Sequence, residues 1–118
     1  MLFSRDHIWI DISSNVAKLG ISDYAQSELG SIIFLNLPAI GEEIQSGIRF
    51  GDIETLKTIS DLIAPICGKV IAVNEFLVDN PESIHKKPYE CWFIQVEIKH
   101  NLNELMDEPT YEEYVKTI

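Results

Sequence analysis

The sequence has few cysteines, no long apolar run and no recognisable leader. Cys67 and Cys91 are the only cysteines among its 118 residues, with no Cys-x-x-Cys pair and no histidine at zinc-ligand spacing. A disulfide framework or a zinc site is therefore not expected. No stretch approaches the ~20 apolar residues that span a bilayer, and residues 1–6 do not resemble a signal peptide. We expect a cytoplasmic protein with no membrane partner.

Basic residues are also scarce. Nine lysines and arginines stand against nineteen aspartates and glutamates, which gives a formal net charge of −10. Lys86 and Lys87 are the only adjacent basic pair, whereas a phosphate backbone needs clustered basic side chains. We therefore expect no nucleic acid partner. An acidic surface favours encounter with basic patches on partner proteins.

Motifs of the common enzyme classes are missing. The sequence contains no Gly-x-Ser-x-Gly, Gly-x-Gly-x-x-Gly or P-loop motif. A cysteine–histidine pair drawn from Cys67, Cys91, His7, His85 and His100 is the remaining catalytic alternative, and no local signature supports it. The sequence predicts a protein that is not itself an enzyme.

The chain has the size and composition of one compact domain, with 46% hydrophobic residues. Short apolar or alternating segments separated by turn residues predict many strands. The expected strands are 8–12, with one buried face, 16–21, 31–38, 50–55, 59–63, 69–73 and 92–98, and a very short one between Gly41 and Gly47. Residues 74–88 are expected to form a long polar connection. This pattern favours a β-sandwich or flattened barrel with helices outside.

Two segments have helical character. Ser22 or Asp23 can cap a short helix through Leu29, with Gly30 as its stop. In the tail, residues 101–118, Leu102, Leu105, Met106, Tyr111, Tyr114, Val115 and Ile118 have helical spacing. Asp107 is the expected cap of a tail helix, and Pro109 lies in the tolerated first turn.

A lone lysine stands in the segment Glu54-Thr55-Leu56-Lys57-Thr58-Ile59-Ser60-Asp61, where the chain is expected to turn between two strands. Its neighbours are apolar or hydroxyl residues, with acidic groups three residues before it and four after it. Taken alone, these eight residues describe an exposed lysine at a hairpin bend.

The flanking segments are more specific. They are His7-Ile8-Trp9, Gly20-Ile21-Ser22-Asp23-Tyr24-Ala25-Gln26-Ser27-Glu28-Leu29-Gly30, Leu37-Pro38-Ala39-Ile40-Gly41, Ala64-Pro65-Ile66-Cys67-Gly68-Lys69-Val70, Val73-Asn74-Glu75, Asn80-Pro81-Glu82-Ser83-Ile84 and Pro88-Tyr89. Together with the lysine segment they resemble the glycine cleavage system H-protein family, from about His7 to Tyr114. This family consists of lipoyl carriers.

The resemblance implies a fold and a site. The fold is a mostly β, lipoyl/biotinyl-type flattened barrel (barrel-sandwich hybrid) with a short internal helix and C-terminal helices. Residues 1–118 form one carrier domain, and 101–118 is a helical tail packed on the barrel. Lys57 is the implied attachment point of lipoate, through an amide. Glu54, Gly68 and Gly41 match positions that the lipoate-attaching enzyme reads. Biotin carriers usually have methionines on both sides of the lysine, whereas Leu56 and Thr58 stand here.

The implied function is a swinging-arm carrier that shuttles an aminomethyl group and reducing equivalents. Its implied partners are the lipoate-attaching enzyme, a pyridoxal phosphate-dependent glycine decarboxylase, an aminomethyltransferase and a flavin dihydrolipoamide dehydrogenase. The few charges near the arm and the acidic surface suit transient docking by a monomer.

Some residues depart from the family pattern. Ile8 stands where the family usually has glutamate, and Cys67 stands at a position that is commonly serine or another small residue. Related carriers also act as lipoate relays or in disulfide-reductase-like sulfur oxidation, where Cys67 and Cys91 could exchange with a dithiolane. An unmodified interaction module is the alternative from another class.

Overall fold

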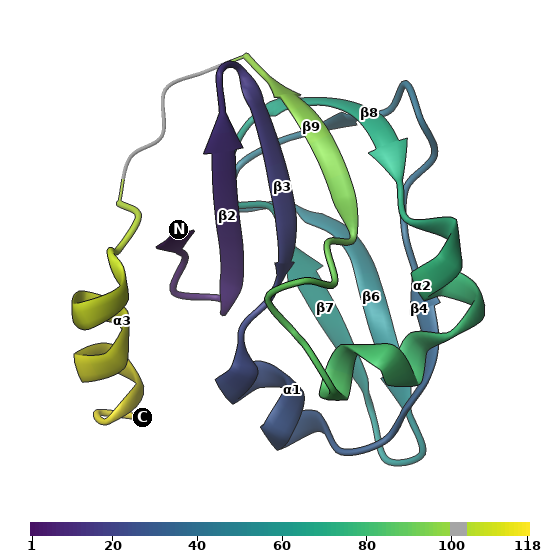
Figure 1. The fold of residues 1–118 in the computed structure, drawn as a ribbon, viewed down its shortest axis with the longest axis vertical. Coiled ribbons are helices and arrows are strands. Elements are labelled where there is room, and N and C mark those ends of the chain that lie inside the picture. Colours follow the sequence, from purple (N-terminus) through teal and green to yellow (C-terminus); the bar gives the residue numbers. More distant parts are fainter. Residues whose placement is uncertain (100–103) are drawn as a thin grey trace.

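The computed structural model describes residues 1–99 and 104–118, and within them two antiparallel sheets face each other (Figure 1). The larger sheet has the strand order β1 (Leu2–Phe3), β2 (Ile8–Ser13), β3 (Val16–Ile21), β9 (Ile94–Ile98), β8 (Gly68–Val73) and β5 (Glu43–Ile44). The smaller sheet has the order β4 (Ile32–Asn36), β6 (Arg49–Thr55) and β7 (Ile59–Ile63). The predicted mostly β, flattened architecture is confirmed, and the two sheets do not close into a continuous barrel.

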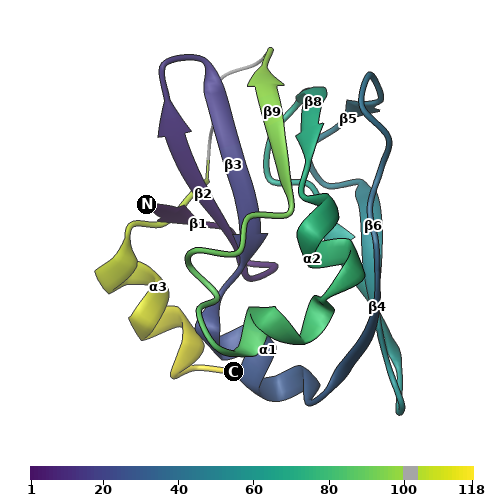
Figure 2. The same ribbon diagram turned by 45° about the vertical axis from the view of Figure 1, so that its right-hand side comes forward.

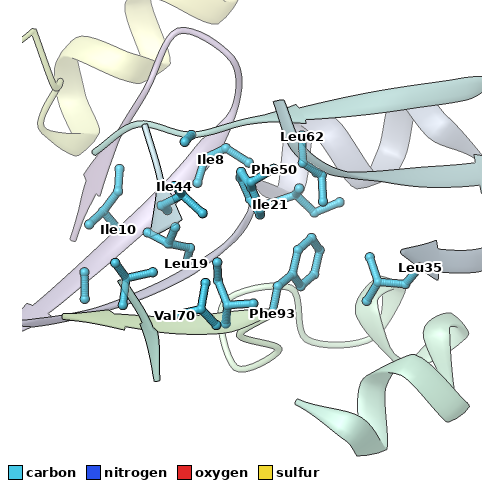
Figure 3. Close-up of a cluster of buried hydrophobic side chains, with 14 of the residues drawn as sticks. Ile8, Ile10, Leu19, Ile21, Leu35, Ile44, Phe50, Leu62, Val70 and Phe93 are labelled. Carbon is cyan, nitrogen blue, oxygen red and sulfur yellow. The ribbon is translucent and has the colours of Figure 1, made fainter. Parts of the chain in front are cut away.

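The main core fills the space between the sheets. Since side chains alternate across a strand, every second residue of the central strands points inward. Figure 3 shows inward-pointing side chains from both sheets. Its deeply buried members include Ile8, Ile10, Leu19, Ile53, Ile66, Val70, Phe93, Ile94 and Val96. Each buried aliphatic side chain contributes on the order of 2 kcal/mol relative to exposure, so this layer holds both sheets in place.

A second apolar cluster lies on the opposite side of β2. Trp9 is only 2% exposed and packs there with Phe3, Met106 and Tyr111. The expectation that β2 has one buried face is therefore wrong for its first half, because the tail of the chain covers Trp9. In the second half, Ile12 is exposed rather than buried.

The predicted helix caps are confirmed. Helix α1 (Asp23–Leu29) begins where the Ser22 hydroxyl accepts a hydrogen bond from Ala25 N at 3.1 Å, and Gly30 follows its end. Helix α3 (Glu108–Val115) begins where Asp107 Oδ1 accepts one from Thr110 N at 3.0 Å. The hydrogen bonds from Thr110 hold the pKa of the Asp107 carboxyl below its usual value.

Less of the tail is helical than the sequence suggests. Met106 is extended, because its backbone exchanges two 2.8 Å hydrogen bonds with Phe3 at the edge of the larger sheet. The tail therefore has a single helix in the part that the structure describes, in place of several, and it starts only after Asp107. The expected position of Leu102 lies outside the described residues.

The expectation of a polar connection over residues 74–88 is wrong, because this segment is largely helical. It contains α2 (Glu75–Asp79) and a 3-10 helix, η1 (Pro81–His85), which Figure 2 shows in green above α1. The Asn74 side chain caps α2, and Leu77 and Ile84 are buried at 1% and 0% exposure. Only Leu77, Pro81 and Ile84 are buried among these ten helical residues, so the segment has no continuous apolar run and resembles a polar connection in the sequence. Among the described residues, no helix has the length and apolar character needed to cross a membrane.

Gly68 is explained by close packing at the start of β8. A Cβ atom at this position would collide with the carbonyl oxygen of Glu97 and the side chain of Val96.

We expect Gly68→Ala to lower the free energy of unfolding by about 2 kcal/mol or more, measured by urea denaturation. The neighbouring exposed Lys69 provides a control, since Lys69→Ala should change it by less than about 0.5 kcal/mol. Equal stability of the two variants would contradict this packing argument.

Candidate functional site

The hairpin of β6 and β7 carries Lys57 at its tip. The hairpin turn extends beyond the rest of the smaller sheet at the lower end of Figure 2. Leu56 is 86% exposed, and Lys57 and Thr58 are exposed as well. The expected turn near residues 56–58 is confirmed.

Thr55 closes this turn. The last paired residues of the ladder are Glu54 and Ile59. Beyond them, Thr55 N donates to the carbonyl of Thr58 at 2.9 Å. The Thr55 hydroxyl oxygen accepts hydrogen bonds from the backbone N–H groups of Lys57 and Thr58, each at 3.2 Å. A β-branched residue with a hydroxyl suits both the strand end and this side-chain turn. The backbone under Lys57 is thus held firmly.

The side chain of Lys57, in contrast, is uncommitted. Its ammonium group forms no ion pair and no hydrogen bond with any other residue in the described part of the chain. A primary amine on a four-carbon stem, held away from the core, can reach into the active site of another protein. This arrangement fits covalent attachment of an acyl group such as lipoate.

A polar network lies on the outer face of the smaller sheet. Asn36 Nδ2 donates to Asp52 Oδ1 at 2.6 Å and to Glu54 Oε1 at 3.3 Å. Arg49 forms ion pairs with Asp52 and with Asp61, the latter at 3.1 Å. The network crosses all three strands, so it ties the base of the hairpin together. It also fixes the Glu54 carboxylate beside the tip.

A hollow of about 310 Å³ lies where α1, β7 and the loop after β1 meet. Its lining includes the acidic residues Asp6, Glu28 and Asp61 together with His7 and Tyr24, and the Asp61 carboxylate is paired with Arg49 on the outer face of the sheet. The acidic residues in its wall favour a ligand with positive charge. Its walls come from four separate segments, so no local pattern in the sequence indicates it.

His7 connects the wall of this hollow to the tail helix. Its Nδ1 lies 2.7 Å from the Tyr111 hydroxyl, which in turn lies 2.6 Å from Ser22 Oγ. Burial lowers the pKa of the His7 imidazole, and the nearby Asp6 carboxylate opposes this shift only in part. Burial likewise raises the pKa of Tyr111 to about 12. Both side chains are therefore neutral at pH 7.

The lowered pKa of His7 makes stability depend on pH. The folded protein binds a proton at His7 less readily than the unfolded chain, whose histidine pKa is about 6.5. The contribution of neutral His7 to the free energy of unfolding is present above about pH 6.5 and is lost as the pH falls through the pKa of His7 in the folded protein. We expect wild type to lose more thermal stability between pH 7.5 and 5 than His7→Asn, which does not titrate and tolerates the φ of 68°. A difference between the two proteins that does not vary with pH would contradict this.

The other expected recognition residues lie apart from the tip. Gly68 pairs with Ile44 and Ile98 in the larger sheet. Gly41 has a φ of 97°, which favours glycine, and its N–H donates to the carbonyl of Val70 at 2.8 Å. The fold itself therefore accounts for glycine at both positions. Only Glu54 lies beside Lys57.

The two thiols are also separated from each other. Cys67 adjoins the Gly68–Ile98 end of the β8–β9 ladder, and Cys91 precedes the opposite end. Five strand residues at about 3.3 Å each separate these ends by roughly 15 Å, whereas a disulfide needs Cα atoms within about 7 Å. Both cysteines are free and half-buried. Burial raises the pKa of the Cys91 thiol.

We expect no disulfide within one folded molecule. After mild oxidation, the intact mass should still be that of the protein with both thiols reduced, two hydrogens heavier than a disulfide form. Cys91 should be alkylated more slowly in the folded protein than in urea, because its raised pKa and its burial reduce the thiolate that is accessible. Formation of a disulfide between Cys67 and Cys91 under native conditions would contradict the separation.

Comparison with known proteins assigns the family. A model of the glycine cleavage H-protein matches residues 1–118. The chain belongs to the glycine cleavage H-protein family. Glycine cleavage system H proteins from two strains of Staphylococcus epidermidis are each 44% identical to it over 116 residues, covering 96% of this chain and 92% of the relative. The crystal structure of a glycine cleavage system H protein from Mycobacterium marinum matches with a TM-score of 0.87 and 34% identity, covering 98% of this chain and 94% of that one.

This membership confirms the kind of function expected from the sequence. Glycine cleavage H proteins carry lipoate covalently on a lysine and are carrier subunits, not catalysts. The chain is thus a lipoyl carrier that acts with the glycine cleavage enzymes. The alternatives, a sulfur-oxidation carrier, a lipoate relay and an unmodified module, are not favoured.

Proposed function

We propose that Lys57 is the lysine that bears lipoate in this chain. The observation that carries the proposal is the combination of a firmly hydrogen-bonded turn and an exposed amine without partners at its tip. Lys69, Lys86, Lys87 and the remaining lysines do not occupy the tip of a two-stranded hairpin. Lys57 combines a held backbone and an uncommitted side chain with a place at the tip of a hairpin.

The chemistry of attachment asks little of this chain. The neutral ε-amine of Lys57 attacks the carboxyl carbon of an activated lipoyl ester, the activating group leaves, and the nitrogen loses a proton as the amide forms. Held on Lys57, lipoate would supply a dithiolane able to carry the aminomethyl group left after glycine loses carbon dioxide, and the dehydrogenase partner would reoxidise the attached dithiol. The residues around Lys57 fix the root of the arm and leave the rest of it mobile.

The partners follow from this cycle. We propose contacts with a lipoate-attaching enzyme, a pyridoxal phosphate-dependent glycine decarboxylase, an aminomethyltransferase and a flavin dihydrolipoamide dehydrogenase. A carrier that visits several active sites needs weak and transient contacts, and the net charge of −10 suits encounters steered by basic partner surfaces. The acidic hollow beside β7 suits the cargo, because an aminomethyl amine carries a positive charge.

We also propose that the attaching enzyme reads Glu54 directly. Its carboxylate lies on the outer face, immediately before the turn, and Asn36 Nδ2 holds it at 3.3 Å. Gly41 and Gly68 would affect lipoylation through the shape of the sheets.

Replacement of the tip lysine tests the assignment. We expect Lys57→Arg, produced in lipoate-replete cells, to lose the lipoyl adduct completely in intact-mass spectrometry, because a guanidinium is not acylated. Lys69→Arg is the matched control, since Lys69 is also exposed on a strand, and it should keep the adduct. A lipoyl adduct on Lys57→Arg, or wild type that remains unmodified, would exclude the assignment.

A further inference from the structure

The end of the smaller sheet next to Lys57 carries large apolar side chains in solvent. Phe34 pairs with Glu54, and Glu54 pairs with Ile59, so these three side chains form one row on the same face of the sheet. Phe34 is 58% exposed and Ile59 is 62% exposed. Leu56 extends the row into the turn. We call Phe34, Glu54, Leu56 and Ile59 the tip surface.

The tip surface is not used by the fold. In the adjacent row Leu35 and Ile53, which point to the opposite face, are buried at 4% and 1% exposure. The sheet therefore has its core on one side only. Single exposed apolar residues are ordinary, whereas several gathered beside a reactive group indicate an interaction site.

We propose that the tip surface is the docking surface for the lipoate-attaching enzyme; this rests on Lys57 being the lipoylated residue. The attaching enzyme must reach the amine of Lys57 itself, which is only four methylene groups from the backbone. The walls of its active site must therefore pass beside the turn and the row behind it. Enzymes that act on the attached lipoyl group meet the far end of a much longer arm, so they have no such need.

Charge complementarity specifies the chemistry of that partner. The Glu54 carboxylate lies within the row, and the Asp61 carboxylate, 59% exposed and paired with Arg49, lies on the same face two rows further from the tip. A complementary face would have an apolar centre that receives Phe34, Leu56 and Ile59, with lysine or arginine at its rim. The net charge of −10 would add long-range attraction to such a rim.

Serine replacements with matched controls test this surface. We expect Phe34→Ser and Ile59→Ser each to raise the apparent KM for lipoylation by a purified lipoate-attaching enzyme about tenfold, with little change in kcat, because docking is lost while Lys57 remains. Ile48→Ser and Ile40→Ser should stay within about twofold of wild type. Ile48 and Ile40 have matching exposures of 58% and 66%, and Ile48 precedes β6, roughly 20 Å along the strand from Glu54.

A second measurement separates the attaching enzyme from the others. Once fully lipoylated, Phe34→Ser and Ile59→Ser should be reduced by dihydrolipoamide dehydrogenase at the wild-type rate. Circular dichroism melting should match wild type for all four variants, because the replaced side chains are exposed. An unchanged KM for lipoylation in both tip variants, an equal rise in both controls, or a defect confined to the dehydrogenase reaction would each overturn the docking proposal.

The charged rim has its own readout. The KM of wild type for lipoylation should rise with ionic strength, and Glu54→Gln should show a shallower dependence, since glutamine keeps the shape and the hydrogen bond from Asn36 without the charge. The proposal of a partner with a basic rim would be overturned if the KM of wild type did not change with ionic strength, or if Glu54→Gln showed the same change. Failure of Lys57 to accept lipoate in wild type would instead remove the proposed function, so the two failures are distinguishable.

Discussion

Antiparallel pairing of β6 with β7 is the constraint on which the site depends. The ladder keeps the strands in register up to Glu54 and Ile59, and Thr55 then closes the turn through its backbone and its hydroxyl. Only Leu56 and Lys57 lie beyond this closure. Rigidity at the root and freedom at the amine therefore come from the same few hydrogen bonds.

The two faces of the smaller sheet serve different purposes. Inward side chains such as Ile53 and Leu62 pack against the larger sheet and fix the direction in which the hairpin points. Outward side chains are released from packing and can meet other proteins. The Arg49–Asp52–Asp61 pairs tie the outward face together without covering the tip. A carrier with no catalytic group of its own depends on this division of labour.

Local signals predicted much of the fold and the centre of the site. Ser22 and Asp107 act as caps because a short polar side chain satisfies the backbone N–H groups of the next turn, whatever surrounds it. The sequence likewise predicts the hairpin around Lys57, since apolar strand segments lie on both sides of the turn. Helix α2 and η1 show no helical period in the sequence, because α2 buries only Leu77 and η1 only Pro81 and Ile84.

The sequence by itself determined the strand periods, the capped helices, the acidic charge and a lysine segment shared with a carrier family. These properties depend on neighbouring residues, so they can be read along the chain. Tertiary structure decided that Trp9 is covered by the tail, that Cys67 and Cys91 lie at opposite ends of a ladder, and that Phe34 and Ile59 flank Glu54. Those relations depend on strand register and sheet packing between distant segments, which local periodicity does not encode.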